Sequence, residues 1–335
     1  MSQSKIPPTL SAMPAPVLEK IVEHTDFLTK LALRKVKPLR NTVKNEKTQL
    51  YQIYVNPQND HYVKVSITVS EKSPYDTDQF KYKQVDGGCL IKKRDFSKLI
   101  VDGDMNELIA ADLSLILANP LITIDKLWFE HEQSIFNVGP IGGALSTLLS
   151  KIEETILKKR SRTLNVNELT IYKTKEPADV FKMLPYVTPG VLKHLSCSAV
   201  DENIDIGLVT QLPHFEHLES LNGFANVTAE MWSRCKYMHT GVDFNNADIL
   251  VLLQAALDHG QDFQCYDFGV VDGFDQMQLN ELISQFGETG SFEENVKYIS
   301  MANGTDILLI QLFDYGRLKI SKNNREQCMR VLNRD

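Results

Sequence analysis

The chain has 335 residues, of which 43 % are hydrophobic and 24 % are charged, and its formal net charge is −7 at pH 7. This length allows one large domain, or a small module followed by a larger one, and the composition is that of an ordinary globular protein. The acidic balance excludes a protein that binds nucleic acid over its whole surface, because phosphate contacts need basic side chains.

Cysteine spacing and hydropathy indicate the cellular compartment in which the protein is found. The five cysteines are scattered, and no two have the short spacing of a zinc site or a redox pair. The apolar runs Ile249–Leu253 and Ile307–Phe313 are too short to cross a bilayer, and the first nine residues lack the apolar stretch of a signal peptide. We therefore expect an intracellular protein, cytoplasmic, nuclear or both, with no membrane partner, no nucleic-acid partner and no cofactor.

The first section of the chain is predicted to be helical. Val17, Leu18, Ile21 and Val22 are spaced to lie on one side of a short helix, and Pro14 suits the position before its first turn. Ordering the backbone costs about 1–2 kcal/mol per residue, and a segment this short therefore cannot fold alone. Its apolar side must pack on the rest of this chain, as a helical hairpin, or on a partner. The pattern leaves both arrangements, packing on this chain and packing on a partner, open.

The next section has the two-residue period of β-strands. Val63, Val65, Ile67 and Val69 alternate with polar residues, which is typical of a half-buried strand. Similar alternation begins at Tyr51, and turn residues stand at 56–60 and at 86–88. We expect a small antiparallel β-meander over residues 49–94.

From about Asp104 the pattern alternates between helix and strand. Asp104 and Glu107 have the spacing of a capping box, which predicts a helix that ends before Asn119-Pro120. A strand is predicted over 121–129, and a second amphipathic helix runs from Leu145 to Ile156.

A repeat follows these elements. Leu169, Leu195 and Leu221 are 26 residues apart in each step, within the range of roughly 20–29 residues found for leucine-rich repeats. The sequence therefore predicts an α+β protein: a helical segment, the meander, and an irregular leucine-rich-repeat-like α/β solenoid over 104–322. Residues 323–335 would form a C-terminal tail or helix.

The segment 8–46 resembles an F-box. Met13-Pro14, Val17-Leu18 and Ile21-Val22 follow the order and spacing of the opening of that motif, and residues 26–41 resemble its middle and end. Two features depart from it: Thr25 stands where leucine is usual, and Lys37-Pro38 replaces a stretch that usually contains cysteine or serine.

The remainder, residues 49–322, resembles the FTH domain of the nematode-expanded F-box A family. The residues that carry this likeness are Val85–Ile91, Leu108–Leu117 and Lys126–Phe129, in that order along the chain. Together the two resemblances cover the chain from about Leu10 to about Lys322. They imply a modular protein with adaptor-binding helices followed by a domain that holds a target.

The resemblance implies a function in ubiquitin conjugation. The F-box would bind a Skp-type adaptor and through it a cullin ligase, and the FTH-like domain would bind a target protein, so that the chain is a non-catalytic substrate-recognition subunit. The target and the residues that bind it cannot be read from the sequence. The alternative is a protein-interaction scaffold with a degenerate F-box, which the departures at Thr25 and Lys37-Pro38 favour. The expected adaptor-binding residues are Met13, Pro14, Val17, Leu18, Ile21, Val22, Phe27, Leu31, Leu33, Val36 and Leu39.

Other chemical signals are weak. His214 and His217 have a spacing that suits a metal, but no third ligand is evident nearby, so we interpret both as surface histidines. No Gly-x-Ser-x-Gly elbow is present. Lys158–Arg162 matches a minimal nuclear-import patch and equally a basic helix C-terminus. We predict no catalytic residues and no metal site.

Overall fold

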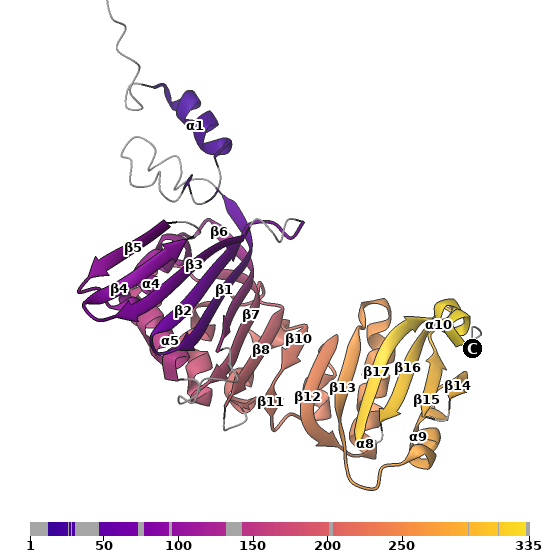
Figure 1. Ribbon diagram of the computed structural model, residues 1–335. Helices are drawn as coiled ribbons and strands as arrows, with labels where there is room; N and C mark the ends of the chain where they lie inside the picture. The colour runs from indigo at the N-terminus through magenta and orange to yellow at the C-terminus, as the bar shows by residue number, and fades with distance from the viewer. Residues whose placement is uncertain are drawn as a thin grey trace, which may run out of the picture. The chain divides into compact units, whose positions relative to one another are not determined.

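The computed structural model divides the chain into two compact units (Figure 1). The first comprises Met1–Asn167 with Phe181–Thr188, and the second comprises Glu168–Val180 with Pro189–Asp335. The residues that the structure describes are 13–25, 27, 29–30, 47–72, 77–93, 96–131, 143–200, 204–293, 295–313 and 315–332.

The first unit is built on a mixed sheet. Its first five strands pair antiparallel in chain order, and the sixth adds parallel to the first, which gives the order β6-β1-β2-β3-β4-β5. The strands are β1 (Thr48–Asn59), β2 (Tyr62–Thr68), β3 (Thr77–Val85), β4 (Gly88–Lys93), β5 (Phe96–Val101) and β6 (Ile122–Glu130).

One face of this sheet is covered by two helices, α4 (Met105–Leu117) and α5 (Gly143–Thr155) (Figure 1). Val55 and Val65 lie opposite each other on the covered face and are buried. The Tyr82 hydroxyl of β3 donates to the Asp112 carboxylate of α4 at 2.7 Å, which ties the helix to the sheet. Successive residues of a strand point to opposite sides, so Lys64, next to the buried Val65, lies on the other face.

Helix α4 begins where the sequence predicts. The Asp104 carboxylate accepts a hydrogen bond from the Glu107 amide at 2.8 Å, so it satisfies one of the donors that a helix N-terminus leaves unpaired. A short 3₁₀ turn, η2 (Leu157–Lys159), follows α5, and η4 (Leu184–Tyr186) also belongs to this unit.

The second unit contains a longer mixed sheet with the order β14-β15-β16-β17-β13-β12-β10-β8-β7. Its strands from β7 to β13 are parallel, and those from β13 to β14 are antiparallel. They are β7 (Asn165–Thr174), whose residues from Glu168 belong to this unit, β8 (His194–Ala199), β10 (Ser220–Asn222), β12 (Tyr237–Phe244), β13 (Cys265–Val270), β14 (Thr289–Glu293), β15 (Val296–Ser300), β16 (Asp306–Phe313) and β17 (Arg317–Asn324).

Short helices connect these strands. Two helices begin with a complete capping box, in which Asn245 pairs with Asp248 and Asp275 pairs with Gln278. A two-stranded sheet of β9 (Ile204–Asp205) and β11 (Phe224–Ala225) lies among the connections. The helices are η3 (Pro177–Lys182), α6 (Gly207–Thr210), η5 (Phe215–His217), α7 (Ala229–Trp232), α8 (Asn246–His259), η6 (Gly260–Asp262), α9 (Gln276–Ile283) and α10 (Arg325–Leu332).

A row of buried side chains crosses the sheet of the second unit. Leu169, Leu195 and Leu221 are direct partners across parallel strands, and the row continues over four further strands. Every member of the row is fully buried. The members beyond the leucines are Met238, Tyr266, Ile320 and Ile310.

Charged side chains of alternating sign line the amino ends of the parallel strands. Glu219 lies 3.3 Å from Lys193 and 3.2 Å from Lys236, and Lys236 lies 3.6 Å from Asp262. Burial raises the pKa of Glu219, but the hydrogen bonds from the two lysines outweigh it, so the pKa lies below its ordinary value. This chain of ion pairs aligns neighbouring strands at one end.

The predicted fold class is wrong. Mixed sheets dominate the described chain, in place of a helical segment followed by a small meander and a leucine-rich-repeat solenoid. The strands of the expected meander belong to a sheet that β6 extends, and the 26-residue repeat belongs to a sheet whose other half is antiparallel. Local periodicity identified several elements but could not show the pairings of β1 with β6 and of β13 with β17, because these pairings join residues that are distant in sequence.

We predict that Leu195→Ala lowers the free energy of unfolding by about 2–5 kcal/mol, because it leaves a cavity in the middle of the buried row. Urea unfolding followed by tryptophan fluorescence measures this change. Leu208→Ala is the matched control in the same unit: Leu208 is exposed, so we expect a change within about 0.5 kcal/mol. Equal effects of the two substitutions would contradict the assignment of the core.

Candidate functional site

The first candidate surface is helix α1 (Ala15–Glu23), which lies where the F-box resemblance begins. Pro14 precedes its first turn, and the chain leaves the helix at His24. Leu18 and Val22, one turn apart, are buried, and so is Phe27 just beyond the helix. These three predicted adaptor-binding residues are therefore covered by this chain.

The neighbouring strip of α1 is more accessible. Val17 is 44 % exposed, Pro14 is exposed, and Met13 and Ile21 are half-buried. Val17 and Ile21 are one turn apart, next to the strip of Leu18 and Val22, so the helix has an apolar side of which one half is covered. The remaining predicted residues, Leu31, Leu33, Val36 and Leu39, lie outside the described residues.

Polar groups close the end of α1. The Thr25 hydroxyl donates to the Ile21 carbonyl, so the residue that departs from the F-box pattern satisfies a helix C-terminal carbonyl. Lys20 and Glu23 form an exposed ion pair at 2.7 Å. The hydrogen bond between Lys20 and Glu23 raises the pKa of Lys20 and lowers the pKa of Glu23.

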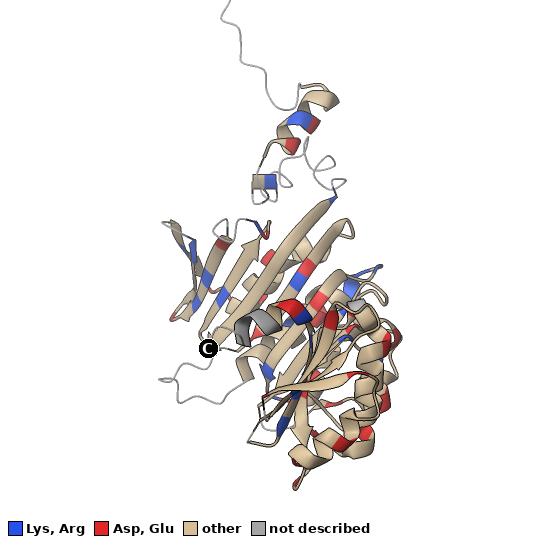
Figure 2. Cartoon of the chain, turned by 90° about the vertical axis from the view of Figure 1, so that its right-hand side faces the viewer, with Lys and Arg blue, Asp and Glu red and all other residues tan. Residues whose placement is uncertain are grey.

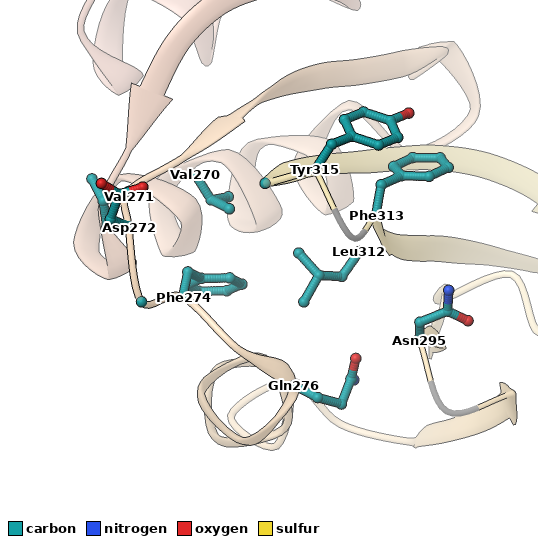
Figure 3. A pocket seen from close by; sticks show the side chains of 11 residues that line it. Val270, Val271, Asp272, Phe274, Gln276, Asn295, Leu312, Phe313 and Tyr315 are labelled. Carbon is teal, nitrogen blue, oxygen red and sulfur yellow. The ribbon is translucent and has the colours of Figure 1, made fainter.

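The second candidate surface is a cavity of about 780 Å³ in the second unit (Figure 3). It lies beyond the end of β13, between the β16–β17 turn and the start of α9. Gly316 accepts a hydrogen bond from the Val270 amide at 3.0 Å, and Asn295 accepts one from the Leu312 amide at 3.1 Å. These backbone bonds hold the walls. The lining residues are Val270, Val271, Asp272, Gly273, Phe274, Gln276, Asn295, Leu312, Phe313, Tyr315 and Gly316.

The cavity is lined by both apolar side chains and polar groups. Figure 3 shows Phe274 and Leu312 pointing toward each other across it, with the Gln276 amide below them. Phe313 and Tyr315 stack with their ring centroids 5.3 Å apart. The Nε2 atom of Gln276 is buried and has no hydrogen-bond partner among the described residues. Such a site can take an apolar side chain that has a hydrogen-bond acceptor beside it.

Sequence reasoning named no residue of this cavity. Its walls come from residues 270–276 and 312–316, which meet because β13 pairs with β17. The available signal was the placing of aromatic residues beside turn glycines, as in Gly273-Phe274 and Tyr315-Gly316. Both glycines have positive φ, 86° and 72°, which marks tight turns.

A polar cluster lies on the sheet face of the second unit, on the neighbouring strands β12, β13 and β17. Arg317 donates to Asp267 Oδ1 from both Nε, at 2.9 Å, and Nη2, at 2.6 Å. His239 Nδ1 lies 3.2 Å from Asp267 Oδ2. Nearby, burial raises the pKa of the Cys265 thiol, which favours its protonated form. The cluster therefore joins three strands by charged hydrogen bonds.

The described ranges contain neither a cluster of metal ligands nor a helix suited to span a membrane. No three His, Cys, Asp or Glu side chains in them converge on a position suited to a metal ion. No helix in them has the length and hydropathy that a membrane span needs. Our interpretation of both histidines as surface residues is half wrong: His217 is exposed, but His214 is buried beside η5.

The fold and these surfaces define a mixed-sheet protein with a short amphipathic helix ahead of its first strand and a cavity in its second unit. Comparisons of the chain with protein-family models, with curated proteins and with solved structures find no match. The F-box and FTH-like resemblance therefore stays a prediction.

We predict that Asp267→Asn lowers the free energy of unfolding by about 1–3 kcal/mol, because Arg317 loses its charged acceptor in a partly buried position. Thermal or urea unfolding measures the loss. Asp258→Asn is the control, since Asp258 is exposed and accepts from the neutral Gln254 amide. If both variants are as stable as the wild type, the cluster does not join the strands.

Proposed function

We propose that the chain is a non-catalytic, substrate-recruiting subunit of a Skp–cullin–F-box type ubiquitin ligase. In this proposal α1 and the residues after it bind a Skp-type adaptor, and the sheet-based units bind the target protein. Such a subunit carries out no bond chemistry. It raises the effective concentration of the target near the ubiquitin-charged enzyme.

The observation that carries the proposal is the divided apolar side of α1. The strip of Leu18 and Val22 is covered by this chain, while Val17 on the adjacent strip is 44 % exposed. A helix that only capped the sheet would bury its most apolar side as fully as it could. A helix that packs on its own chain with one strip and on a partner with the next needs this arrangement.

The structure changes the roles we assign to the predicted residues. Leu18, Val22 and Phe27 pack inside the chain, so they support the binding surface. Val17, with Pro14 and the half-buried Met13 and Ile21, supplies the contact on α1. An interface of ordinary size buries about 800 Å² on each partner, more than one helical strip offers. We therefore expect the rest of the contact from Leu31, Leu33, Val36 and Leu39.

One observation favours the alternative, a protein-interaction scaffold with a degenerate F-box. The Thr25 hydroxyl is bonded to the backbone of α1, so this position adds no apolar contact where the F-box pattern has leucine. Loss of one buried leucine contact costs an interface about 1–3 kcal/mol, which weakens adaptor binding without removing it.

We assign target binding in part to the cavity lined by Phe274, Leu312 and Phe313. Pockets that combine aromatic and aliphatic side chains with polar groups bind the anchor side chains that dominate protein–protein affinity. Gln276 Nε2 would donate to a carbonyl of the bound segment, because its own hydrogen-bonding capacity is unused within the described chain.

We predict that Val17→Asp weakens binding of a Skp-type adaptor about tenfold or more, because it places a charge at the centre of an apolar contact. Binding of the purified full-length chain to the adaptor, measured by calorimetry, tests this. Val17 is exposed, so the substitution leaves the fold intact. Glu19→Ala, on the polar side of α1, is the matched control and should bind as the wild type does.

Two results would count against the proposal. Undiminished binding by Val17→Asp would remove α1 from the adaptor interface. Absence of adaptor binding by the wild-type chain would favour the scaffold. Mass spectrometry of proteins retained by the full chain, and by a chain lacking residues 1–46, separates the two readings: only the ligase subunit loses adaptor and cullin together while other partners stay.

A further inference from the structure

Strand β5 is the last strand of the first unit's sheet. It pairs with β4, and no other strand in the described part of the chain pairs with it. An edge strand presents backbone N–H and C=O groups that a further strand can bind. The pairing register identifies which groups these are.

Hydrogen-bonded positions alternate along an antiparallel pair. The Asp102 amide, just after β5, donates to the Gly87 carbonyl at 2.9 Å. Residues 96, 98 and 100 therefore direct their backbone groups to β4, as Asp102 does. The backbone groups of Ser97, Leu99 and Val101 point away from the sheet, toward the position of an added strand.

The side chains of β5 are unusually apolar for an edge. Phe96 is 61 % exposed, Leu99 is 49 % exposed and Val101 is 70 % exposed. Proteins usually protect edge strands with charges, prolines, bulges or a covering segment, and in β5 Lys98 is the one charged residue. An apolar edge of this kind marks an interaction surface.

A row of lysines crosses the sheet beside this edge. Lys64 is paired with Lys81, Lys81 with Lys92, and Lys92 with Ser97 of β5. Like charges directly opposite each other on neighbouring strands are destabilising. Among the described residues, these three lysines form no ion pair. Lys83, two residues after Lys81 in β3, lies on the same face.

The opposite face of the same strands shows the contrast. There Lys93 forms an ion pair with Asp78 at 3.1 Å and lies over the Phe80 ring. Tyr82 of β3 bonds to helix α4, so the neighbouring Lys81 and the lysine row lie on the face away from that helix. Basic residues are coloured blue on neighbouring strands of this sheet in Figure 2. Positive charge is thus concentrated on the accessible face, next to the apolar edge.

We propose that β5 binds an extended acidic segment of another protein as an added β-strand. The segment's backbone pairs with Ser97, Leu99 and Val101, its carboxylates lie on the face that carries Lys92 and Lys81, and its alternate apolar side chains lie on the opposite face, beside Phe96 and Ile100. This inference names the class of target for the proposed function and rests on it.

Charge and geometry select this occupant. Strands in a sheet are about 4.8 Å apart, so the added strand lies about 10 Å from β4, a gap that a lysine and a glutamate side chain together span. Pairing of β5 with β5 of a second copy would bring two lysine rows together, which is repulsive. Single-stranded nucleic acid binds by stacking successive bases on several aromatic side chains, whereas β5 has one aromatic residue, Phe96.

The test uses the full-length chain, without adaptor, and a fluorescein-labelled peptide of about eight residues that alternates glutamate and valine. Fluorescence anisotropy should show binding that weakens as salt is raised, since exposed charges are screened. A peptide that alternates lysine and valine should not bind. Because no adaptor is present, failure of this assay and failure of adaptor binding are separate outcomes.

Three variants locate the site. Leu99→Pro removes an outward-pointing N–H and keeps the pairing with β4, so peptide affinity should fall about tenfold or more. Leu99→Thr keeps that N–H and is the matched control, with a smaller loss. Lys81→Gln combined with Lys92→Gln should weaken binding of the acidic peptide and reduce its salt dependence. Circular dichroism shows whether each variant is folded.

Several results would overturn the proposal. They are binding by Leu99→Pro as tight as by the wild type, tighter binding of an oligothymidylate of matched length, and self-association in sedimentation analysis that Leu99→Pro abolishes.

Discussion

The register of strand pairing is the constraint on which both units depend. Side chains alternate between the two faces of a strand, so one register decides for every residue whether it is buried under helices or faces solvent. In the second unit this register aligns Leu169, Leu195 and Leu221 in one buried row. In the first unit it aligns Lys64, Lys81 and Lys92 in an equally regular row on the accessible face.

The same constraint explains how the proposed function is divided along the chain. Packed sheets hold their surfaces rigid, because each strand is fixed by neighbours on both sides. An open sheet also has edges, and β5 is an edge whose apolar side chains are exposed. The helix α1 differs in kind: part of its apolar side is covered by the chain and part is left accessible. Rigid sheets suit target recognition, and a short helical segment suits docking on an adaptor.

Sequence patterns predicted individual elements well where the period was clear. The strand β2 spans Tyr62–Thr68, where apolar and polar residues alternate, and α4 begins after Asp104 as the capping spacing predicts. The patterns failed at assembly. The parallel pairing of β1 with β6 joins Leu50 to Ile124, and that of β13 with β17 is antiparallel, so neither follows from local periodicity. The 26-residue spacing is real for β7, β8 and β10, but the solenoid prediction applied it to the whole of residues 104–322.

What the sequence by itself determined is local: which segments are helices or strands, and which of their sides are apolar. The F-box likeness of residues 8–46 stays a prediction. Only the tertiary structure decided which of those apolar residues are covered. Leu18 and Val17 are adjacent and both apolar, yet one is buried and the other is not. The cavity at Phe274 exists only once β13 pairs with β17, and the lysine row exists only in the register that pairs β2, β3 and β4. Hydrophobicity is a property of each residue, whereas burial depends on neighbours that the chain brings together from far along its length.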